Sequence, residues 1–251
     1  MKNSFYFFAH QDDEFGVFNL IKKDANDKSK IFCFYLTSGT VGNNSPKIRN
    51  LESIKVLKKL GIQEKDIIFA GARLGIDDGN LINNLKKAEG YIQRFLKKSN
   101  EKSKIYIPAW EGGHPDHDCL HAIVSKIAFK KHIQDSVYQF PLYNAYNRFW
   151  KFFSVLTPLK ENGITINDDI SWLDRIYFLR LTFYYHSQYI SWMGLFPFVL
   201  FNYLFIGIQS LQPISLKRIQ LKPHNGKLYY EKRNFAKWIN ISKKIRAFLK
   251  K

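Results

Sequence analysis

Four of the seven histidines lie in two short segments that also carry several carboxylates. The first segment runs Ala9-His10-Gln11-Asp12-Asp13-Glu14, and the second runs Glu111-Gly-Gly-His114-Pro-Asp116-His117-Asp118-Cys-Leu-His121. Imidazole together with carboxylate is a ligand set suited to a divalent first-row metal, with zinc as the default. A catalytic zinc site uses three protein ligands and leaves one position for water. The two segments therefore predict a metal site.

Each segment alone has a plainer interpretation. A single histidine after a strand is usually a hydrogen-bonded loop residue. Asp-Asp-Glu before a helix commonly caps that helix and complements its dipole. The two segments together, in order and each after a predicted strand, favour the metal site over these alternatives.

The elements that must position these residues follow from the apolar pattern. Over the first 140 residues, short apolar runs alternate with amphipathic stretches, as strands and crossover helices do in a parallel sheet. Strands are expected at Ser4–Phe8, Lys30–Leu36, Asp66–Ala70, Lys104–Pro108 and Ser136–Phe140, and helices at Phe15–Lys23, Ile48–Leu60, Leu81–Lys98 and His117–Lys131. Continuous apolar runs suit strands that are covered on both faces. Ligand sites of such sheets lie beyond the carboxyl ends of the strands, so both segments should open at the same edge.

Ala-His-x-Asp-Asp-Glu at 9–14 and His-Pro-Asp-His at 114–117 resemble the paired signatures of the LmbE/PIG-L family of zinc-dependent de-N-acetylases. The resemblance extends to Arg49-x-x-Glu52 with Leu60-Gly61, to Leu74-Gly-x-Asp-Asp-Gly79-x-Leu81 and to Ser187-Gln188. It implies a Rossmann-like α/β catalytic domain over residues 1–190 that removes acetyl from N-acetylglucosaminyl compounds. One departure concerns the substrate: Thr37-Ser-Gly39-Thr40 lacks the acidic residue that often follows this glycine in the family.

By that resemblance, His10, Asp13 and His117 would be the zinc ligands and Asp12 the general base. The spacing agrees with these roles. His10 and Asp13 are three residues apart on a tight strand-to-helix turn, which can direct both at one ion. Asp12 then stays beside the ion without binding it, where a carboxylate can take a proton from the attacking water.

The second segment offers further candidates. His114 is placed to donate to the developing oxyanion or to protonate the leaving amine, with Asp116 as its orienting partner. His121 lies four residues after His117 on a predicted helix and could also reach a metal, but the family pattern supplies the ligands elsewhere. We therefore expect His121 to support the ligands or to pack in the core, and Cys119 to be a buried thiol. In the first segment, Glu14 is expected to support the helix rather than to react.

Three residues are candidates for binding the substrate. Arg49 contacts the substrate in the family, and a permanently charged fork suits a sugar hydroxyl, a carboxylate or a phosphate. On composition alone, a surface helix arginine is an equally good interpretation. Asp77 and Asp78 are both candidates for recognising a sugar hydroxyl, and the register between them stays open.

The net charge of +18 comes from 39 Lys and Arg against 21 Asp and Glu. Residues 1–125 hold 19 basic and 15 acidic side chains, whereas residues 126–251 hold 20 basic and 6 acidic ones. The basic excess therefore belongs to the C-terminal half and calls for an anionic partner. We do not expect that partner to be nucleic acid, because no recognition motif accompanies the lysines and they surround an uncharged aromatic stretch.

That stretch is unusually apolar. No charged residue occurs between Arg180 and Lys217, and the run Trp192–Ile208 is almost wholly apolar. The run is shorter than the ~20 residues of a spanning helix, and Pro197 and Asn202 interrupt it. A buried or substrate-covering helix pair is therefore favoured over insertion into one leaflet of a membrane.

The last part of the chain, residues 191–251, is expected to pack on the catalytic domain or to extend it. The Asn-Gly at 225–226 predicts a hairpin turn before a strand at Leu228–Glu231. Residues Lys232–Lys251 contain eight basic and no acidic side chains, with apolar residues near one helical face. Such a basic amphipathic helix can lie on an anionic membrane, or it can dock on the protein with a solvated outer face.

The composition sets the cellular context. Hydrophobic residues at 45% and aromatic residues at 16% argue against disorder. Two cysteines, Cys33 and Cys119, exclude a disulfide framework and a cysteine-based zinc finger. The N-terminal apolar run is too short for a signal peptide, so a cytoplasmic protein is expected, with peripheral contact at the inner face of the cytoplasmic membrane as an option.

The expected function is zinc-dependent removal of the N-acetyl group from an N-acetylamino sugar, with another divalent first-row metal as the alternative cofactor. The basic, aromatic C-terminal half favours an anionic or lipid-linked sugar, such as a nucleotide-, lipid- or glycan-linked intermediate of bacterial surface polysaccharide synthesis. One alternative is a deacetylase of a sugar-thiol or antibiotic conjugate. Another is an inactive homologue that binds a glycan or a membrane. The complete set of ligands and base argues against this last alternative, because a binding protein does not need Asp12 beside the metal.

Overall fold

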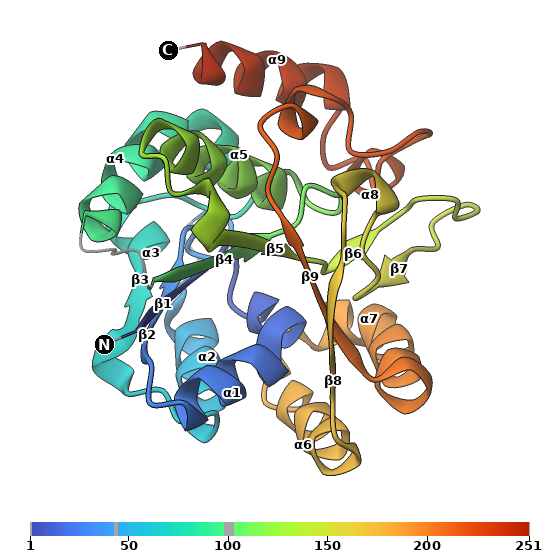
Figure 1. Ribbon diagram of the computed structural model, residues 1–251. Helices are drawn as coiled ribbons and strands as arrows, with labels where there is room; N and C mark the ends of the chain where they lie inside the picture. Colours follow the sequence, from blue (N-terminus) through green and yellow to red (C-terminus); the bar gives the residue numbers. More distant parts are fainter. Residues whose placement is uncertain (1, 43–44, 98–102, 251) are drawn as a thin grey trace.

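A computed structural model describes residues 2–42, 45–97 and 103–250 of the chain (Figure 1). Its centre is a seven-stranded sheet of order β3-β2-β1-β4-β5-β9-β8. The strands are β1 Asn3–Phe8, β2 Lys30–Tyr35, β3 Ile67–Phe69, β4 Lys104–Pro108, β5 Val137–Phe140, β8 Ile166–Asp169 and β9 Ile208–Pro213. The first five are parallel, and β9 and β8 are antiparallel. Two further strands, β6 Tyr143–Asn144 and β7 Ser154–Val155, pair with each other.

Helices cover both faces of this sheet. They are α1 Phe18–Asn26, α2 Lys47–Lys59, α3 Ala70–Leu74, α4 Leu85–Leu96, α5 Pro115–Lys130, α6 Trp172–Thr182, α7 Tyr189–Phe201, α8 Tyr229–Lys232 and α9 Trp238–Leu249. Helices α4, α5 and α9 lie on one face, and α1, α2, α6 and α7 lie on the other (Figure 1). The predicted α/β fold, with a mostly parallel sheet flanked by helices, is confirmed.

The central strand β1 shows why the sheet needs two covering layers. Successive side chains of a strand point to opposite faces. Phe5 and Phe7 join the core beneath α4, α5 and α9, whereas Tyr6 and Phe8 join the core beneath α1, α2, α6 and α7. All four are buried. The continuous apolar runs thus mark strands covered on both faces, as expected.

Two of the predicted helices begin with a tighter turn. The helix predicted at Phe15–Lys23 divides into a 3-10 turn at Asp13–Val17 and α1. The helix predicted at Leu81–Lys98 opens with a 3-10 turn at Leu81–Asn83 before α4, and its last residue lies outside the described part of the chain. Such turns are frequent at helix N-termini.

The C-terminal part is built into the same sheet. The apolar run Trp192–Ile208 forms most of α7, a π-helical turn at Asn202–Ile206 and the first residue of β9. The expected division between residues 190 and 191 falls inside α7, and β9 pairs with β5. The chain thus runs from α7 directly into a strand of the central sheet, so no boundary separates the two at residue 190.

The predicted hairpin at Leu228–Glu231 is wrong, because this segment forms the short helix α8. Glu231 accepts hydrogen bonds from the backbone N–H groups of Leu228 and Trp238, at 3.0 Å each. An acidic side chain three residues after the N-cap closes a helical turn, and this local bond overrides the hairpin signal of the Asn-Gly pair.

The basic helix α9 is docked on the protein. Its apolar residues Ile241, Ile245 and Phe248 are buried, and it packs against α5. At its start, Trp238 contacts the ring of Trp110 edge-on at 5.8 Å. Of the two expectations for the basic C-terminal helix, the structure corresponds to a docked helix whose outer face carries the charge.

Candidate metal centre

The two histidine-carboxylate segments meet where the order of the sheet reverses. From β1 the chain proceeds to β2 and β3 on one side, while β4 lies on the other side of β1. The segment 9–14 follows β1, and the segment 111–121 follows β4. Ligand sites of open parallel sheets form at such a switch point, beyond the carboxyl ends of the strands.

The turn after β1 is held together by Asp13. Its Oδ2 atom accepts hydrogen bonds from the backbone N–H groups of Ala9 and His10, at 2.9 and 2.8 Å. Glu14 is buried and accepts from the backbone N–H of Asp12 at 3.0 Å, so it supports the turn as expected. These bonds leave Asp13 Oδ1 free to face the second segment.

Asp12 at the apex of this turn has a left-handed backbone conformation, with φ of 102°. A residue with a side chain adopts this region at an energetic cost, and such positions cluster at functional sites. Arg49 stabilises the turn: its guanidinium donates to the backbone oxygen of Gln11 at 2.6 Å and lies 3.4 Å from Asp12 Oδ1. It also donates to the backbone oxygen of Gly39. Arg49 is buried on a helix rather than exposed at the surface.

His10, Asp13 and His117 form a buried cluster whose potential ligand atoms all lie within 4.8 Å of one another. His117 Nε2 lies 3.0 Å from Asp13 Oδ1, and His10 Nδ1 lies 3.7 Å from Asp13 Oδ2. Burial alone would raise the pKa of Asp13, but the His117 charge and hydrogen bonds to both histidines hold it well below its usual range. The cluster therefore presents an ionised carboxylate between two imidazoles, which is the donor set of a transition-metal site.

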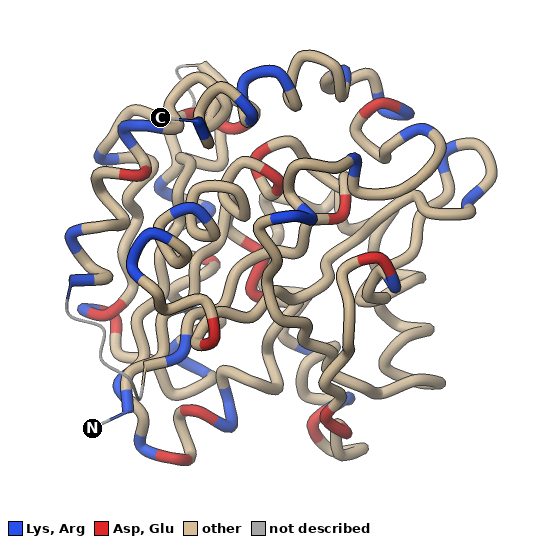
Figure 2. Tube along the Cα trace, turned by 45° about the horizontal axis from the view of Figure 1, so that its top comes forward, with Lys and Arg blue, Asp and Glu red and all other residues tan. Residues whose placement is uncertain are grey.

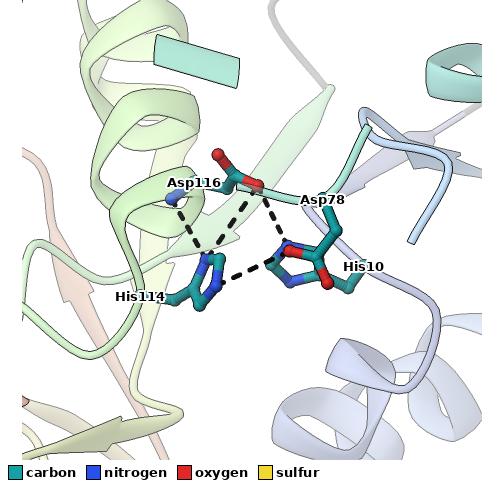
Figure 3. Close-up of side chains that lie close together, drawn as sticks. All are labelled: His10, Asp78, His114 and Asp116. Atoms are coloured by element: carbon teal, nitrogen blue, oxygen red, sulfur yellow. Dashed lines mark hydrogen bonds and ion pairs between the residues drawn. The ribbon is translucent and has the colours of Figure 1, made fainter. Parts of the chain in front are cut away.

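A second cluster shares His10 and adds Asp78, His114 and Asp116 (Figure 3). His10 Nε2 lies 3.0 Å from Asp78 Oδ1 and 3.2 Å from Asp116 Oδ2. Burial alone would lower the pKa of His10, but Asp78 and hydrogen bonds to Asp116 and Asp13 raise it well above its usual value. The surrounding carboxylates thus favour positive charge at His10, which a bound divalent ion would supply in place of a proton.

His114 occupies the N-cap of α5, where its Nδ1 accepts a hydrogen bond from the backbone N–H of Asp116 at 3.2 Å. Burial lowers its pKa to about 4, so the ring is neutral at pH 7. A neutral ring that accepts at Nδ1 carries its hydrogen on Nε2. That atom lies 3.6 Å from Asp78 Oδ1, at the cavity, and is available as a donor.

The carboxylate of Asp116 has a different position from the one expected. It accepts from the backbone N–H groups of Gly79 at 2.7 Å and of Leu81 at 3.1 Å, and it lies 4.0 Å from His114 Nδ1. The backbone of Asp116, rather than its carboxylate, therefore orients His114. Through Gly79, the carboxylate instead fixes the loop that carries Asp78.

The structure also decides the register between the two neighbouring aspartates. Asp78 faces His10 and His114 and lines the cavity, whereas Asp77 accepts a hydrogen bond from Ser38 at 3.3 Å. His121 bonds the backbone oxygen of Pro108 at 2.9 Å and lies outside both clusters. Cys119 is a buried free thiol.

A cavity of about 330 Å³ opens above these groups. His10, Asp12, Asp13, Arg49, Asp78 and His114 line its polar end. Gln188 and Leu195 of another wall belong to segments that the sequence singled out, the second as part of a substrate-covering helix. The remaining walls come from distant segments that the sequence did not indicate, among them Tyr143, Lys151, Phe153, Tyr229, Arg233 and Phe235. Apart from the basic and apolar character of the C-terminal half, no local signal identifies them, because their position depends on how that half folds over the sheet.

One wall of the cavity is positioned by a buried carboxylate. Glu111 Oε1 accepts from the backbone N–H groups of Leu142 and Tyr143, at 2.7 and 2.9 Å. The ring of Tyr143 then lies edge-on to His117, with 5.6 Å between centroids. Burial raises the pKa of Glu111 to about 7, although these hydrogen bonds oppose the shift.

The fold and the site together define an α/β protein with a histidine-carboxylate cluster suited to a metal ion at the switch point of its sheet. Residues 5–128 match the profile of the family PIG-L, GlcNAc-PI de-N-acetylase. The chain therefore contains a deacetylase domain of the PIG-L, or LmbE-like, family, as the two signatures implied. A search of curated proteins found no match to the chain.

Solved structures of deacetylases share the fold. The zinc-inhibited form of a teicoplanin deacetylase superposes with a TM-score of 0.64 at 13% identity, over 85% of this chain and 98% of that chain. The N,N'-diacetylchitobiose deacetylase from Pyrococcus horikoshii superposes with a TM-score of 0.54 at 17% identity, over 85% of this chain and 82% of that chain. At these identities the likeness concerns the fold.

Proposed function

We propose that this protein is a zinc-dependent hydrolase that removes the N-acetyl group from an N-acetylamino sugar. The observation that carries the proposal is the buried cluster of His10, Asp13 and His117, with the carboxylate of Asp12 beside it at the polar end of a cavity. The family of the domain supplies the reaction class. The finer points, the metal and the sugar, are inferred from the residues of this chain.

His10, Asp13 and His117 would hold the ion. Two imidazoles and one carboxylate are a ligand set of catalytic zinc sites that leave a position open. His117 Nδ1 is buried without a hydrogen-bond partner among the described residues, which fits a site completed by an added group. When bound, such an ion activates a water molecule and polarises the amide carbonyl.

Asp12 would act as the general base. Burial raises its pKa to about 7, partly opposed by Arg49, which suits a base that accepts and releases a proton near neutral pH. The left-handed turn and the Arg49 contact at 3.4 Å hold this carboxylate at the cavity. His114, neutral and carrying its hydrogen on Nε2, would donate to the developing oxyanion or to the leaving amine.

The surroundings of the cavity support an anionic carrier on the sugar. A hollow of about 620 Å³ is lined by Arg148, Lys151, Lys227 and Lys232, with Glu231 as its one acidic residue. Lys151 lines both this hollow and the catalytic cavity. A phosphate or diphosphate attached to the sugar would therefore find cationic donors next to the reacting amide.

The test measures acetate released from N-acetylhexosamine conjugates by metal-free and zinc-loaded protein. Nucleoside-diphosphate-linked, lipid-diphosphate-linked, glycopeptide-linked and free sugars are compared. We expect zinc-dependent release that is fastest with a diphosphate carrier. Absence of release from every conjugate, by protein that holds one zinc per chain, would refute the proposed activity. Faster release from the free or the glycopeptide-linked sugar would refute the anionic carrier alone.

A further inference from the structure

The helices α6 and α7 expose an apolar surface that the fold does not cover. Of the 22 exposed large hydrophobic side chains in the described chain, eleven lie between residues 172 and 206. We call these eleven the α6–α7 face: Trp172, Leu173, Ile176, Phe183, Tyr189, Ile190, Met193, Phe201, Leu204, Phe205 and Ile206. Leu173 is 82% exposed and Phe205 is 73% exposed. A concentration of exposed large apolar side chains in one part of a protein is typical of an interaction site.

The opposite side of α7 is anchored in the core. Trp192 packs against Phe15 and Tyr185, with ring centroids 5.4 and 5.6 Å away. Val199 and Tyr203 are buried on the same side. The helix therefore lies flat along the body of the protein and presents only its outer side.

This anchoring indicates how the helix would meet a membrane. The helical stretch His186–Ile206, of 21 residues and mean hydropathy 1.5, is long and apolar enough to span one by length and composition. However, 28% of its most apolar 18-residue window is buried in the protein, and β9 of the central sheet follows directly. A core helix of a soluble protein passes the same test, but it would be mostly buried. A helix with one buried and one exposed apolar side lies along an interface rather than across it.

The charges around the face distinguish between possible occupants. Residues 181–216 carry no charged side chain, and the tube in Figure 2 is tan throughout this segment. Cations flank the aromatic residues of this region: Arg175 lies over the Trp172 ring at 4.4 Å, and Lys55 and Lys59 lie over the Tyr184 ring at 4.6 and 5.2 Å. Aromatic residues beside lysine and arginine are typical of proteins at the lipid headgroup level.

Acidic groups near the face do not reverse this balance. Asp174 of α6 and Asp168 of β8 are paired with Lys22 and Lys23 of α1. Glu52 of α2 accepts hydrogen bonds from the backbone N–H and the hydroxyl of Ser187, at 2.8 and 2.6 Å, beside the lysines that flank Tyr184. The chain as a whole carries a net charge of +18. A second copy docked on the face would bring two such charges together, whereas anionic lipids would be attracted to it.

The face is continuous with the catalytic cavity. Ile190 belongs to the α6–α7 face and also lines the cavity, together with Ser191, Gly194 and Leu195 of the same helix. We infer that the α6–α7 face docks on an anionic membrane and places the mouth of the cavity at the lipid surface. The docking is independent of the proposed deacetylase activity. Only the use of the cavity for a lipid-linked sugar rests on that proposed function.

The test is sedimentation of the full-length protein with vesicles of phosphatidylcholine alone or with phosphatidylglycerol added, without substrate. The variant combines Leu173→Gln, Met193→Gln and Phe205→Gln, which lie outside the cavity. The matched control combines Ile164→Gln, Leu221→Gln and Ile239→Gln, whose side chains are 81%, 60% and 69% exposed elsewhere on the protein. Thermal unfolding verifies that both variants fold.

We expect the wild type and the control to bind the anionic vesicles, and the α6–α7 variant to bind at least about tenfold more weakly, since three apolar side chains lose their burial in lipid. Equal binding by all three proteins overturns the inference, as does a wild type that binds no vesicles. A wild-type dimer that the variant abolishes also overturns it, because the face would then be occupied by a second copy. Acetate release from a water-soluble conjugate should stay unchanged in the variant, which separates docking from catalysis.

Discussion

Asp12→Asn separates the proposed general base from the neighbouring metal ligand. Asparagine has the same size as aspartate, and it tolerates a left-handed backbone better than most residues, so the turn at φ of 102° should persist. The amide oxygen can still accept from Arg49. The substitution removes the ability to take a proton from water, together with the negative charge beside Arg49.

The size of the effect depends on whether another carboxylate can replace Asp12. Besides Asp12 and the proposed ligand Asp13, Asp78 is the acidic residue among those that line the cavity, but its Oδ1 lies 3.0 Å from His10 Nε2 and is engaged there. A general base contributes about 10²–10⁴ to the rate, and with no substitute we expect the upper half of that range. A loss of about 10³–10⁴ in kcat corresponds to about 4–5.5 kcal/mol in the activation barrier.

The assay compares Asp12→Asn with Asp13→Asn by two readouts, acetate release and bound zinc per chain. Asp12→Asn should keep stoichiometric zinc and lose kcat. Asp13→Asn should lose both, because it replaces the carboxylate between His10 and His117 with a weak ligand. If Asp12→Asn lost its zinc, or if its kcat fell less than about tenfold with zinc retained, the assignment of base and ligand would be refuted.

Two further predictions concern stability. The pKa of Glu111 is raised by burial from 4.5 to about 7, so the native state binds the extra proton between these values and its stability falls as the pH rises through them. Urea unfolding should show a loss of about 1–3 kcal/mol between pH 5 and pH 8 that Glu111→Gln lacks, and identical pH slopes would contradict the assignment. Gly71→Ala should cost about 3 kcal/mol or more, because the added Cβ would collide with the backbone of Thr37. Gly90→Ala on α4, where nothing lies within 4 Å, should be neutral or stabilising, and an equal loss in both would refute the steric cause.

The parallel half of the fold could be predicted because its signals are local. After their first residue, runs such as Ser4–Phe8 and Lys104–Pro108 carry apolar or aromatic side chains at successive positions, and this pattern is typical of a strand covered on both faces. The structure places these strands within a residue of their predicted ends. The hairpin predicted at Leu228–Glu231 was wrong, because the Glu231 carboxylate accepts a hydrogen bond from the backbone N–H of Leu228 and so favours a helical turn. Residue types alone do not indicate that bond.

The residues of the candidate site likewise divide into those that the sequence could place and those that it could not. The sequence places His10, Asp13 and His117 after two strands that a parallel sheet must bring to one edge, and their proximity follows from that rule. It could not place Asp116, whose carboxylate turns to Gly79 and Leu81 rather than to His114. That orientation depends on a loop that follows β3, on the other side of β1.

The sequence by itself thus determined which candidate ligands the site contains and the sheet edge that carries them, because residue type, spacing and strand pattern are properties of short segments. Only the tertiary structure decided whether Asp77 or Asp78 faces the cavity, and which distant segments line that cavity. Under the docking that we infer, the membrane contact lies on α7 rather than on α9. The apolar side of α9 is buried against α5, whereas α7 must cover the sheet with one side and leaves the other exposed. Burial is decided by the whole fold, and no segment contains that information alone.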